Sequence, residues 1–202
     1  MKNKIPVYYT DGQMAHVMDG ITRLFGKGEE SMIRHEIESE YVHTDVMTVE
    51  PKGEHKVYAT VGMGARAMDT PSERPAHIEL VMLASPDFGG DTHSKMVIGG
   101  ELCALSKFPF KNDTWFGVGH TINASDYFKK EFGYDAFIFV DLSESVSVED
   151  VGELSYLSLL PIYKDEHKYI MQNSYDVFIE WLYDNYGDAA FYVDSKREHF
   201  EL

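Results

Sequence analysis

A short, almost wholly apolar stretch in the C-terminal third most constrains how this chain can fold. Residues 154–160 read LSYLSLL, so only two of the seven are serines. A run this short and this apolar is typical of a strand in the middle of a sheet rather than of a surface helix. Pro161 follows, and its missing N–H predicts that the strand ends there. The polar segment KDEHKYIMQ then has helical spacing, so we expect the buried strand to lead into a surface helix.

The length and cysteine content indicate one ordinary intracellular domain. The chain has 202 residues, enough for a substantial core, and we treat residues 1–202 as a single domain. Cys103 is the only cysteine, which excludes an internal disulfide framework and favours a cytoplasmic location. No apolar run approaches the roughly 20 residues of a membrane helix, and no apolar segment follows the N-terminal lysines as in a secretory signal. We therefore expect no membrane association.

The charge narrows the classes of partner. The chain has 34 acidic and 18 basic residues, which gives a formal net charge of −16. Such a charge repels phosphate backbones, so the sequence predicts no nucleic-acid binding. It would attract a basic protein partner and speed the encounter. The alternative is that the acidic residues serve only solubility.

Hydrophobic periodicity predicts a mixed set of elements. Apolar residues at three- and four-residue spacing predict a first helix over 12–27, and further helices are expected over 94–107 and 174–186. Strands are expected near 43–50, 55–63, 77–84, 137–140 and 154–160, with 141–153 as an acidic connection. The connections look like hairpins or irregular excursions rather than βαβ units. The expected fold is therefore α+β, with a central, largely antiparallel or mixed sheet flanked by helices.

Two motifs that resemble ligand sites lack supporting residues. His43 and Asp45 are two apart and share a strand face, as in some metal sites, but no further ligands with readable spacing accompany them. A polar pair on the sheet face is the alternative that we favour. Gly62-Met63-Gly64 resembles a phosphate-binding loop, yet no helix pattern and no Lys-Ser/Thr pair follow it. We expect no metal and no cofactor.

Catalytic motifs are also incomplete. Ser145 has no nucleophile elbow around it. His120, in Gly-His-Thr, is of a type that serves as a base near neutral pH, but no nucleophile or metal partner is visible beside it. We expect its ring nitrogens to hold a loop in place and predict no catalytic residues. A hydrolase-like enzyme that uses His120 is kept as an alternative.

The ordered segments resemble the suppressor-of-fused domain over approximately residues 41–181. The strongest markers are the strand ending in Gly62-Met63, the strand with Glu79-Leu80, and Gly119-His120-Thr121 after a tryptophan. A fourth marker is Leu160-Pro161-Ile162-Tyr163, with Glu166 beyond it. The resemblance implies a non-enzymatic protein-binding domain of mixed α/β fold.

The resemblance also suggests two biological roles. Similar animal proteins hold a zinc-finger transcription factor in the cytoplasm by clamping a segment between two domains, and this chain is too short for the second domain. Single-domain bacterial relatives are thought to be immunity proteins that neutralise toxins. We therefore expect an immunity protein that occludes a basic toxin; the alternative is a regulatory module that sequesters a cytoplasmic protein or peptide.

The C-terminal region combines aromatic and acidic side chains, as interfaces with basic proteins do. The candidate partner-binding residues are Tyr183, Asp184, Tyr186, Asp188 and Tyr192.

Overall fold

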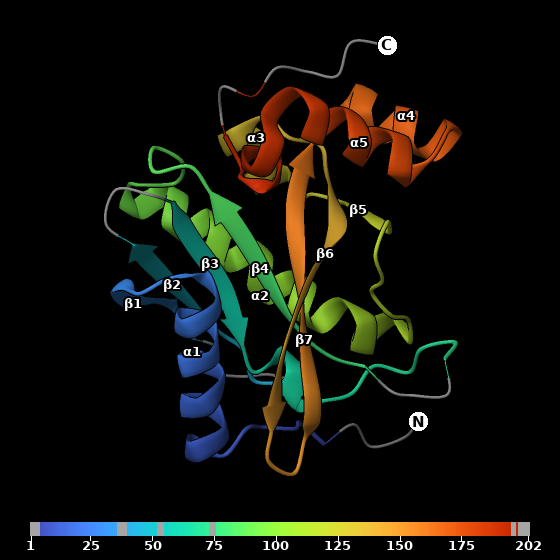
Figure 1. Cartoon of the computed structure of the whole chain (residues 1–202). Helices are drawn as coiled ribbons and strands as arrows, with labels where there is room; N and C mark the ends of the chain where they lie inside the picture. Colours follow the sequence, from blue (N-terminus) through green and yellow to red (C-terminus); the bar gives the residue numbers. More distant parts are fainter. Residues whose placement is uncertain (1–4, 36–39, 52–54, 73–75, 195–196, 198–202) are drawn as a thin grey trace.

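The computed structural model describes residues 5–35, 40–51, 55–72, 76–194 and 197, which include one seven-stranded sheet. The strand order is β1-β2-β3-β4-β7-β6-β5 (Figure 1). The strands are β1 (Gly28–Arg34), β2 (Asp45–Pro51), β3 (Lys56–Val61), β4 (His77–Ala84), β5 (Thr121–Asn123), β6 (Ala136–Val148) and β7 (Gly152–Ile162). The α-helices are α1 (Asp11–Phe25), α2 (Thr92–Asn112), α3 (Asp126–Phe132), α4 (Lys164–Gln172) and α5 (Tyr175–Tyr186).

The sheet is mixed and mostly antiparallel. All neighbouring strands pair antiparallel except β4 and β7, which run parallel in the centre. A parallel pair needs a long crossover, and here the chain between β4 and β7 contains α2, β5, α3 and β6. The expected α+β class with a largely antiparallel or mixed sheet is confirmed.

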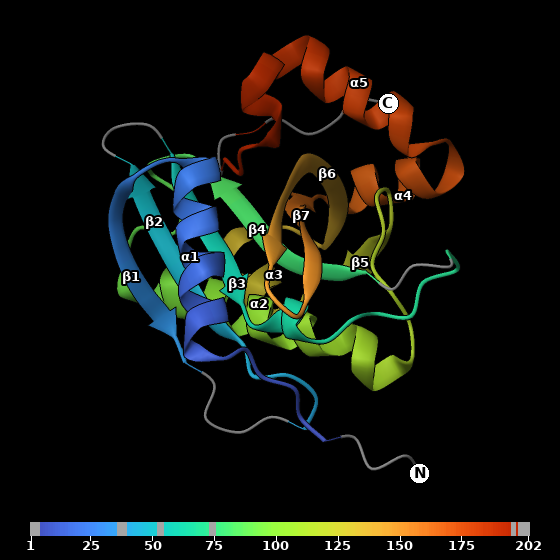
Figure 2. The same cartoon turned by 60° about the horizontal axis from the view of Figure 1, so that its bottom comes forward.

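Helices cover both faces of the sheet (Figures 1 and 2). Helix α1 packs on one face over β2, β3 and the β6–β7 hairpin, whereas α2 and α3 pack on the other. Helices α4 and α5 cover the end of β6 and β7, where alternate β6 residues contact them. These layers explain why both faces of β7 are apolar: Leu157 and Leu159 face α2, whereas Tyr156 and Leu160 face the opposite side.

Helix α1 follows its sequence pattern. Thr10 accepts a hydrogen bond from the Gln13 amide, and the Gln13 side chain bonds back to the Thr10 amide, a complete capping box. Val17 and Ile21, on the apolar stripe of the helix, are buried in the core. The helix ends at Phe25, before Gly26 at φ 110°.

Helix α2 is longer than predicted. It begins at Thr92 and runs through Gly99, Gly100 and Pro109 to Asn112. It is buried around much of its circumference, and this packing outweighs the weak propensity of its glycines. A side chain at Gly99 would meet Arg34 at 3.2 Å, so the glycine lets the helix approach β1 closely.

The β6–β7 hairpin corrects two expectations. Residues 141–148 belong to β6, and β7 begins at Gly152, so the predicted acidic connection is mostly strand. Pro161 lies within the ladder opposite Phe137 rather than ending it. The Pro161 carbonyl points away from β6 and accepts a hydrogen bond from Arg197. The backbone nitrogen of the same residue lies on that side of the strand too, so the lack of an N–H at Pro161 costs no hydrogen bond to β6.

Three elements had no sequence prediction: β1, β5 and α3. Strand β1 lies at a sheet edge and is largely exposed, so it lacks apolar alternation. None of the helices in the described ranges is both long and apolar enough to cross a bilayer.

Candidate functional site

The family-like markers around Gly62 and Glu79 form one buried network. Glu79, on β4, is fully buried. Its Oε1 accepts hydrogen bonds from the Gly62 amide at 2.8 Å, the Gly64 amide at 3.0 Å and the Tyr9 hydroxyl at 3.1 Å. Its Oε2 lies 2.5 Å from the Thr60 hydroxyl. The carboxyl group therefore ties the end of β3, the following turn and the segment before α1 together.

This close packing requires a glycine at position 62 and favours one at position 64. Gly62 has a φ of 127°, and a side-chain carbon there would lie 2.0 Å from the His43 carbonyl oxygen. A side-chain carbon at Gly64 would lie 2.2 Å from Leu154 Cδ1. Burial raises the pKa of the Glu79 carboxyl, although its hydrogen bonds act in the opposite direction. With no exposed surface, Glu79 organises the fold and has no access to a substrate.

Glu166 and Arg197 form a second buried network. Arg197 donates to Glu166 Oε1 at 2.5 Å, to Glu166 Oε2 at 2.8 Å and to the Pro161 carbonyl at 3.0 Å. Burial disfavours the Arg197 charge, but the bonds to Glu166 and its negative charge hold the pKa of Arg197 above its usual value. The guanidinium lies 5.2 Å from the Tyr163 ring centroid and 5.9 Å from that of Tyr134. This pair fixes Arg197 against the start of α4.

His120 is packed against an aromatic ring. Its ring centroid lies 4.3 Å from that of Trp115. Its backbone amide donates to Gly117, and its carbonyl accepts from the Phe139 amide. Within the described residues the hydrogen bonds of His120 thus come from its backbone, whereas we expected them from its ring nitrogens. Ser145 is exposed and donates to Glu153.

The structure divides the candidate partner-binding residues into two groups. Tyr183 and Asp184 are exposed on the outer face of α5. Tyr186 and Tyr192 are half-buried and line a cavity of about 480 Å³. The cavity is also lined by His55, Ser85, Pro86, Ala189, Asp194 and Arg197. The side chain of Asp188 lies outside the described part of the chain.

Helix α5 carries an acidic row that the sequence prediction included only in part. Asp176, Glu180 and Asp184 are spaced by four residues and are all exposed, so they lie along one side of the helix. We refer to these three residues as the acidic row. The exposed side chains of Val177 and Tyr183 flank it, and the helix contains no lysine or arginine. The opposite side of α5 is anchored in the core by Phe178 and Leu182.

The acidic row is unfavourable for the helix itself. Like charges four residues apart destabilise a helix by about 0.2–0.5 kcal/mol per pair. Asp184 lies in the last turn, where the helix dipole favours a positive charge. Helix stability therefore does not account for the acids at 180 and 184. Their i, i+4 spacing is visible in the sequence and could have identified the row.

His43 and Asp45, the pair that resembles a metal site in the sequence, are in contact near the start of β2. His43 Nε2 lies 3.3 Å from Asp45 Oδ1 at the start of β2. His43 lies two residues before β2, so the two side chains meet where the chain enters the strand and not, as predicted, on one strand face.

Comparison with known proteins identifies the class of this domain. A family profile described as Suppressor of fused protein (SUFU) matches residues 40–198. A search of curated proteins found no match. The match covers most of the chain, so the protein belongs to the suppressor of fused family, and the resemblance inferred from the sequence is confirmed.

Solved structures share the fold at low sequence identity. A protein described as a SUFU homologue from Neisseria gonorrhoeae FA 1090 is 15% identical, with a TM-score of 0.68, and 94% of this chain aligns with 97% of that one. A chain from the Sufu–Fu complex is 9% identical, with a TM-score of 0.64 and coverages of 92% and 91%. Drosophila Suppressor of Fused is 8% identical, with a TM-score of 0.61, and 91% of this chain aligns with 50% of that one.

Proposed function

We propose that this chain is a non-enzymatic, cytoplasmic protein-binding domain whose acidic row contacts a basic protein partner. Family membership supports protein binding, because one relative has been solved as the Sufu–Fu complex. The observation that carries the choice of surface is the acidic row of α5, with Tyr183 beside it. An aromatic side chain contributes burial at an interface, while the surrounding carboxylates orient a basic partner.

The finer proposal is an immunity protein. An acidic domain with an exposed row of carboxylates can cover the basic, substrate-binding surface of a toxin and exclude its substrate. The net charge of −16 supports this mechanism, because it speeds encounter with a basic partner. Inhibition by this mechanism requires one domain bound to each toxin molecule and no catalytic turnover by the domain.

A regulatory module that sequesters a cytoplasmic protein is the second candidate. The observation in its favour is the fold shared with Drosophila Suppressor of Fused and with the chain of the Sufu–Fu complex. The two candidates differ in the partner, because an immunity protein abolishes a toxic activity whereas a regulator retains a non-toxic protein.

Affinity capture with matched charge variants tests the proposal. Three immobilised proteins are incubated with proteins from the native source: the wild type, Glu180→Lys/Asp184→Lys and the control Glu29→Lys/Glu149→Lys. The control makes the same change in net charge at exposed positions on β1 and at the β6–β7 turn. That turn lies at the opposite end of the molecule from α5 (Figure 1).

We expect mass spectrometry to identify a basic protein that binds the wild type and the control but not the acidic-row variant. If the chain is an immunity protein, one equivalent abolishes the activity of the purified partner. Equal retention by all three proteins would contradict the assigned surface. Turnover of a substrate by the chain alone would contradict the non-enzymatic function.

A further inference from the structure

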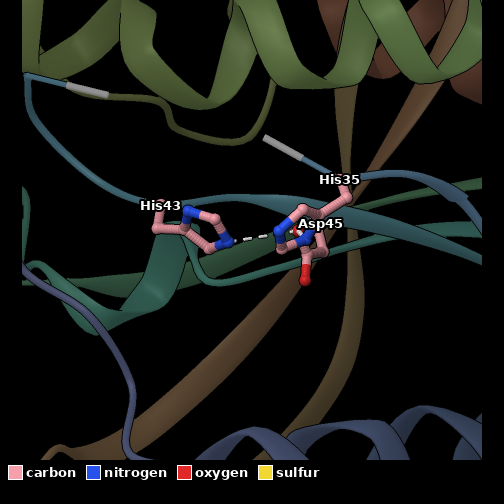
Figure 3. A group of neighbouring side chains, drawn as sticks. All are labelled: His35, His43 and Asp45. Atoms are coloured by element: carbon pink, nitrogen blue, oxygen red, sulfur yellow. Dashed lines mark ion pairs between the residues drawn. The ribbon is translucent and has the colours of Figure 1, made fainter. Parts of the chain in front are cut away.

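Three possible metal ligands meet where β1 ends and β2 begins. His35 Nδ1 lies 2.7 Å from Asp45 Oδ1, and His43 Nε2 lies 3.3 Å from the same oxygen (Figure 3). The ligand atoms of all three residues lie within 4.8 Å of one another. The sequence showed the His43–Asp45 pair but not its third member, His35, which directly follows β1.

A β-bulge brings His35 to this position. From Gly28 to Met32, β1 pairs with β2 in one register, but the register shifts between Met32 and Arg34. Arg34 therefore lies opposite Val46, and continuing the shifted register places His35 opposite Asp45. Bulges redirect side chains in this way and are frequent beside functional sites.

The three residues differ in exposure in a way that suits a metal site. The Asp45 side chain is only 6% exposed and that of His43 is 17% exposed, whereas that of His35 is 64% exposed. Asp45 is thus held by the sheet, and His43 lies in the segment that leads directly into β2. His35 lies on the solvent side of the group, just beyond the last residue of β1.

The geometry points to a binding site for a divalent transition metal ion, with Zn²⁺ as the best-fitting ion, held by His35, His43 and Asp45. Two imidazoles and one carboxylate match the three-ligand Zn²⁺ sites that keep a fourth position open for water. Bonds of 2.0–2.2 Å in a tetrahedral site separate the ligand atoms by about 3.3–3.6 Å. The His43–Asp45 distance of 3.3 Å is already in that range, and the His35–Asp45 distance of 2.7 Å reaches it with an increase of about 0.6 Å.

The ligand types at this site favour some divalent ions over others. Imidazole suits zinc, copper, iron and nickel, whereas Mg²⁺ and Ca²⁺ prefer oxygen ligands alone. The site should therefore discriminate against Mg²⁺ and Ca²⁺. This inference is independent of the protein-binding proposal, because it involves a different end of the sheet from α5 (Figure 1).

Calorimetric titration of chelator-treated protein with zinc chloride tests the site, at a pH where free imidazole is neutral. The wild type is compared with His35→Ala and with the control His93→Ala. His93 is similarly exposed, at 72%, and also contacts a carboxylate, with its Nε2 3.2 Å from Glu131. Circular dichroism shows whether each variant is folded, and the high exposure of His35 predicts that it is.

We expect one zinc ion per wild-type chain, with no binding of Mg²⁺. Removing a residue that only hydrogen-bonds to a metal ligand lowers metal affinity about 10–100-fold. Removing the ligand His35 itself should therefore weaken zinc binding by at least about tenfold. His93→Ala should bind as the wild type does. No zinc binding by the wild type would overturn the proposal, and so would equal affinities in the wild type and His35→Ala.

A second readout uses Co²⁺ in place of zinc. The visible absorption of a Co²⁺ complex reports its geometry, so a tetrahedral spectrum in the wild type and the His93→Ala control, absent in His43→Ala, would support the three-ligand site. An octahedral spectrum in all three proteins, as for ions bound weakly by exposed carboxylates, would contradict it.

Discussion

Gly62 donates its backbone N–H to the buried carboxyl group of Glu79 across 2.8 Å, at the point where β3 ends. The two residues are 17 positions apart and belong to different segments of the chain. Their relationship explains why a glycine and a glutamate both serve as markers of this domain. The carboxyl group satisfies amides of a tight turn, and the glycine permits the turn to approach it.

Glu79→Gln should change how stability depends on pH. The pKa of Glu79 is raised in the folded state, so the folded protein binds more protons than the unfolded chain above the unfolded pKa of about 4.5. The stabilisation by Glu79 is therefore fully present below that pH and is lost as pH rises through the folded pKa. Urea unfolding across a pH series should show the largest advantage of the wild type over Glu79→Gln at low pH. A constant difference would contradict the raised pKa.

Leu159→Ala should destabilise the protein by roughly 2–5 kcal/mol, the range for truncating a buried leucine. Leu159 is 0% exposed in the central strand β7. Val177→Ala is the control, because Val177 is 45% exposed and should change the free energy of unfolding by about 0.5 kcal/mol or less. Urea midpoints measure both, and an unchanged midpoint for Leu159→Ala would show that β7 is peripheral.

Arg197→Met should cost roughly 3–5 kcal/mol, because it leaves the fully buried Glu166 carboxylate without its cation. The double variant Glu166→Gln/Arg197→Met should recover part of this loss, since no charge is then left buried. Lys168→Met on the exposed side of α4 is the control. A double variant no more stable than Arg197→Met would show that the buried charge is not the cause.

Gly100→Ala should stabilise the protein by about 0.5–1 kcal/mol. Gly100 lies inside α2, and a side-chain carbon there has no atom within 4 Å, so the helix gains propensity without a clash. Gly99→Ala is the matched comparison and should gain less, because its added carbon meets Arg34 at 3.2 Å. Thermal unfolding of both variants measures the difference.

The sequence predicted those parts of the fold in which local pattern and burial agree. The stripe of α1, the apolar runs of β3, β4 and β7, and the Ser174 cap of α5 are all local signals. Residues 141–148 were predicted to be a connection because they are rich in acidic residues and serines, and in the structure five of these eight side chains are exposed. Pairing with β7 makes these residues a strand, although their local sequence does not favour one. In the same way, Pro109 lies inside α2 although a proline favours the end of a helix.

The candidate sites depend on contacts that local pattern does not contain. Arg197 pairs with Glu166 from 31 residues away, and His35 reaches Asp45 only because of a bulge in β1. By contrast, the acidic row was accessible from the spacing of residues 176, 180 and 184. The sequence prediction included Asp184 but not the other two residues.

The most direct test of the account measures the association rate of the captured partner by surface plasmon resonance over a salt series. Exposed charges are screened over about 10 Å at 0.1 M ionic strength, so the wild-type rate should fall as salt increases. Glu180→Lys/Asp184→Lys should associate more slowly at low salt and approach the wild-type rate at high salt, while the Glu29→Lys/Glu149→Lys control keeps most of the wild-type rate. An association rate that is indifferent to salt and to reversal of the acidic row would contradict the proposed interface.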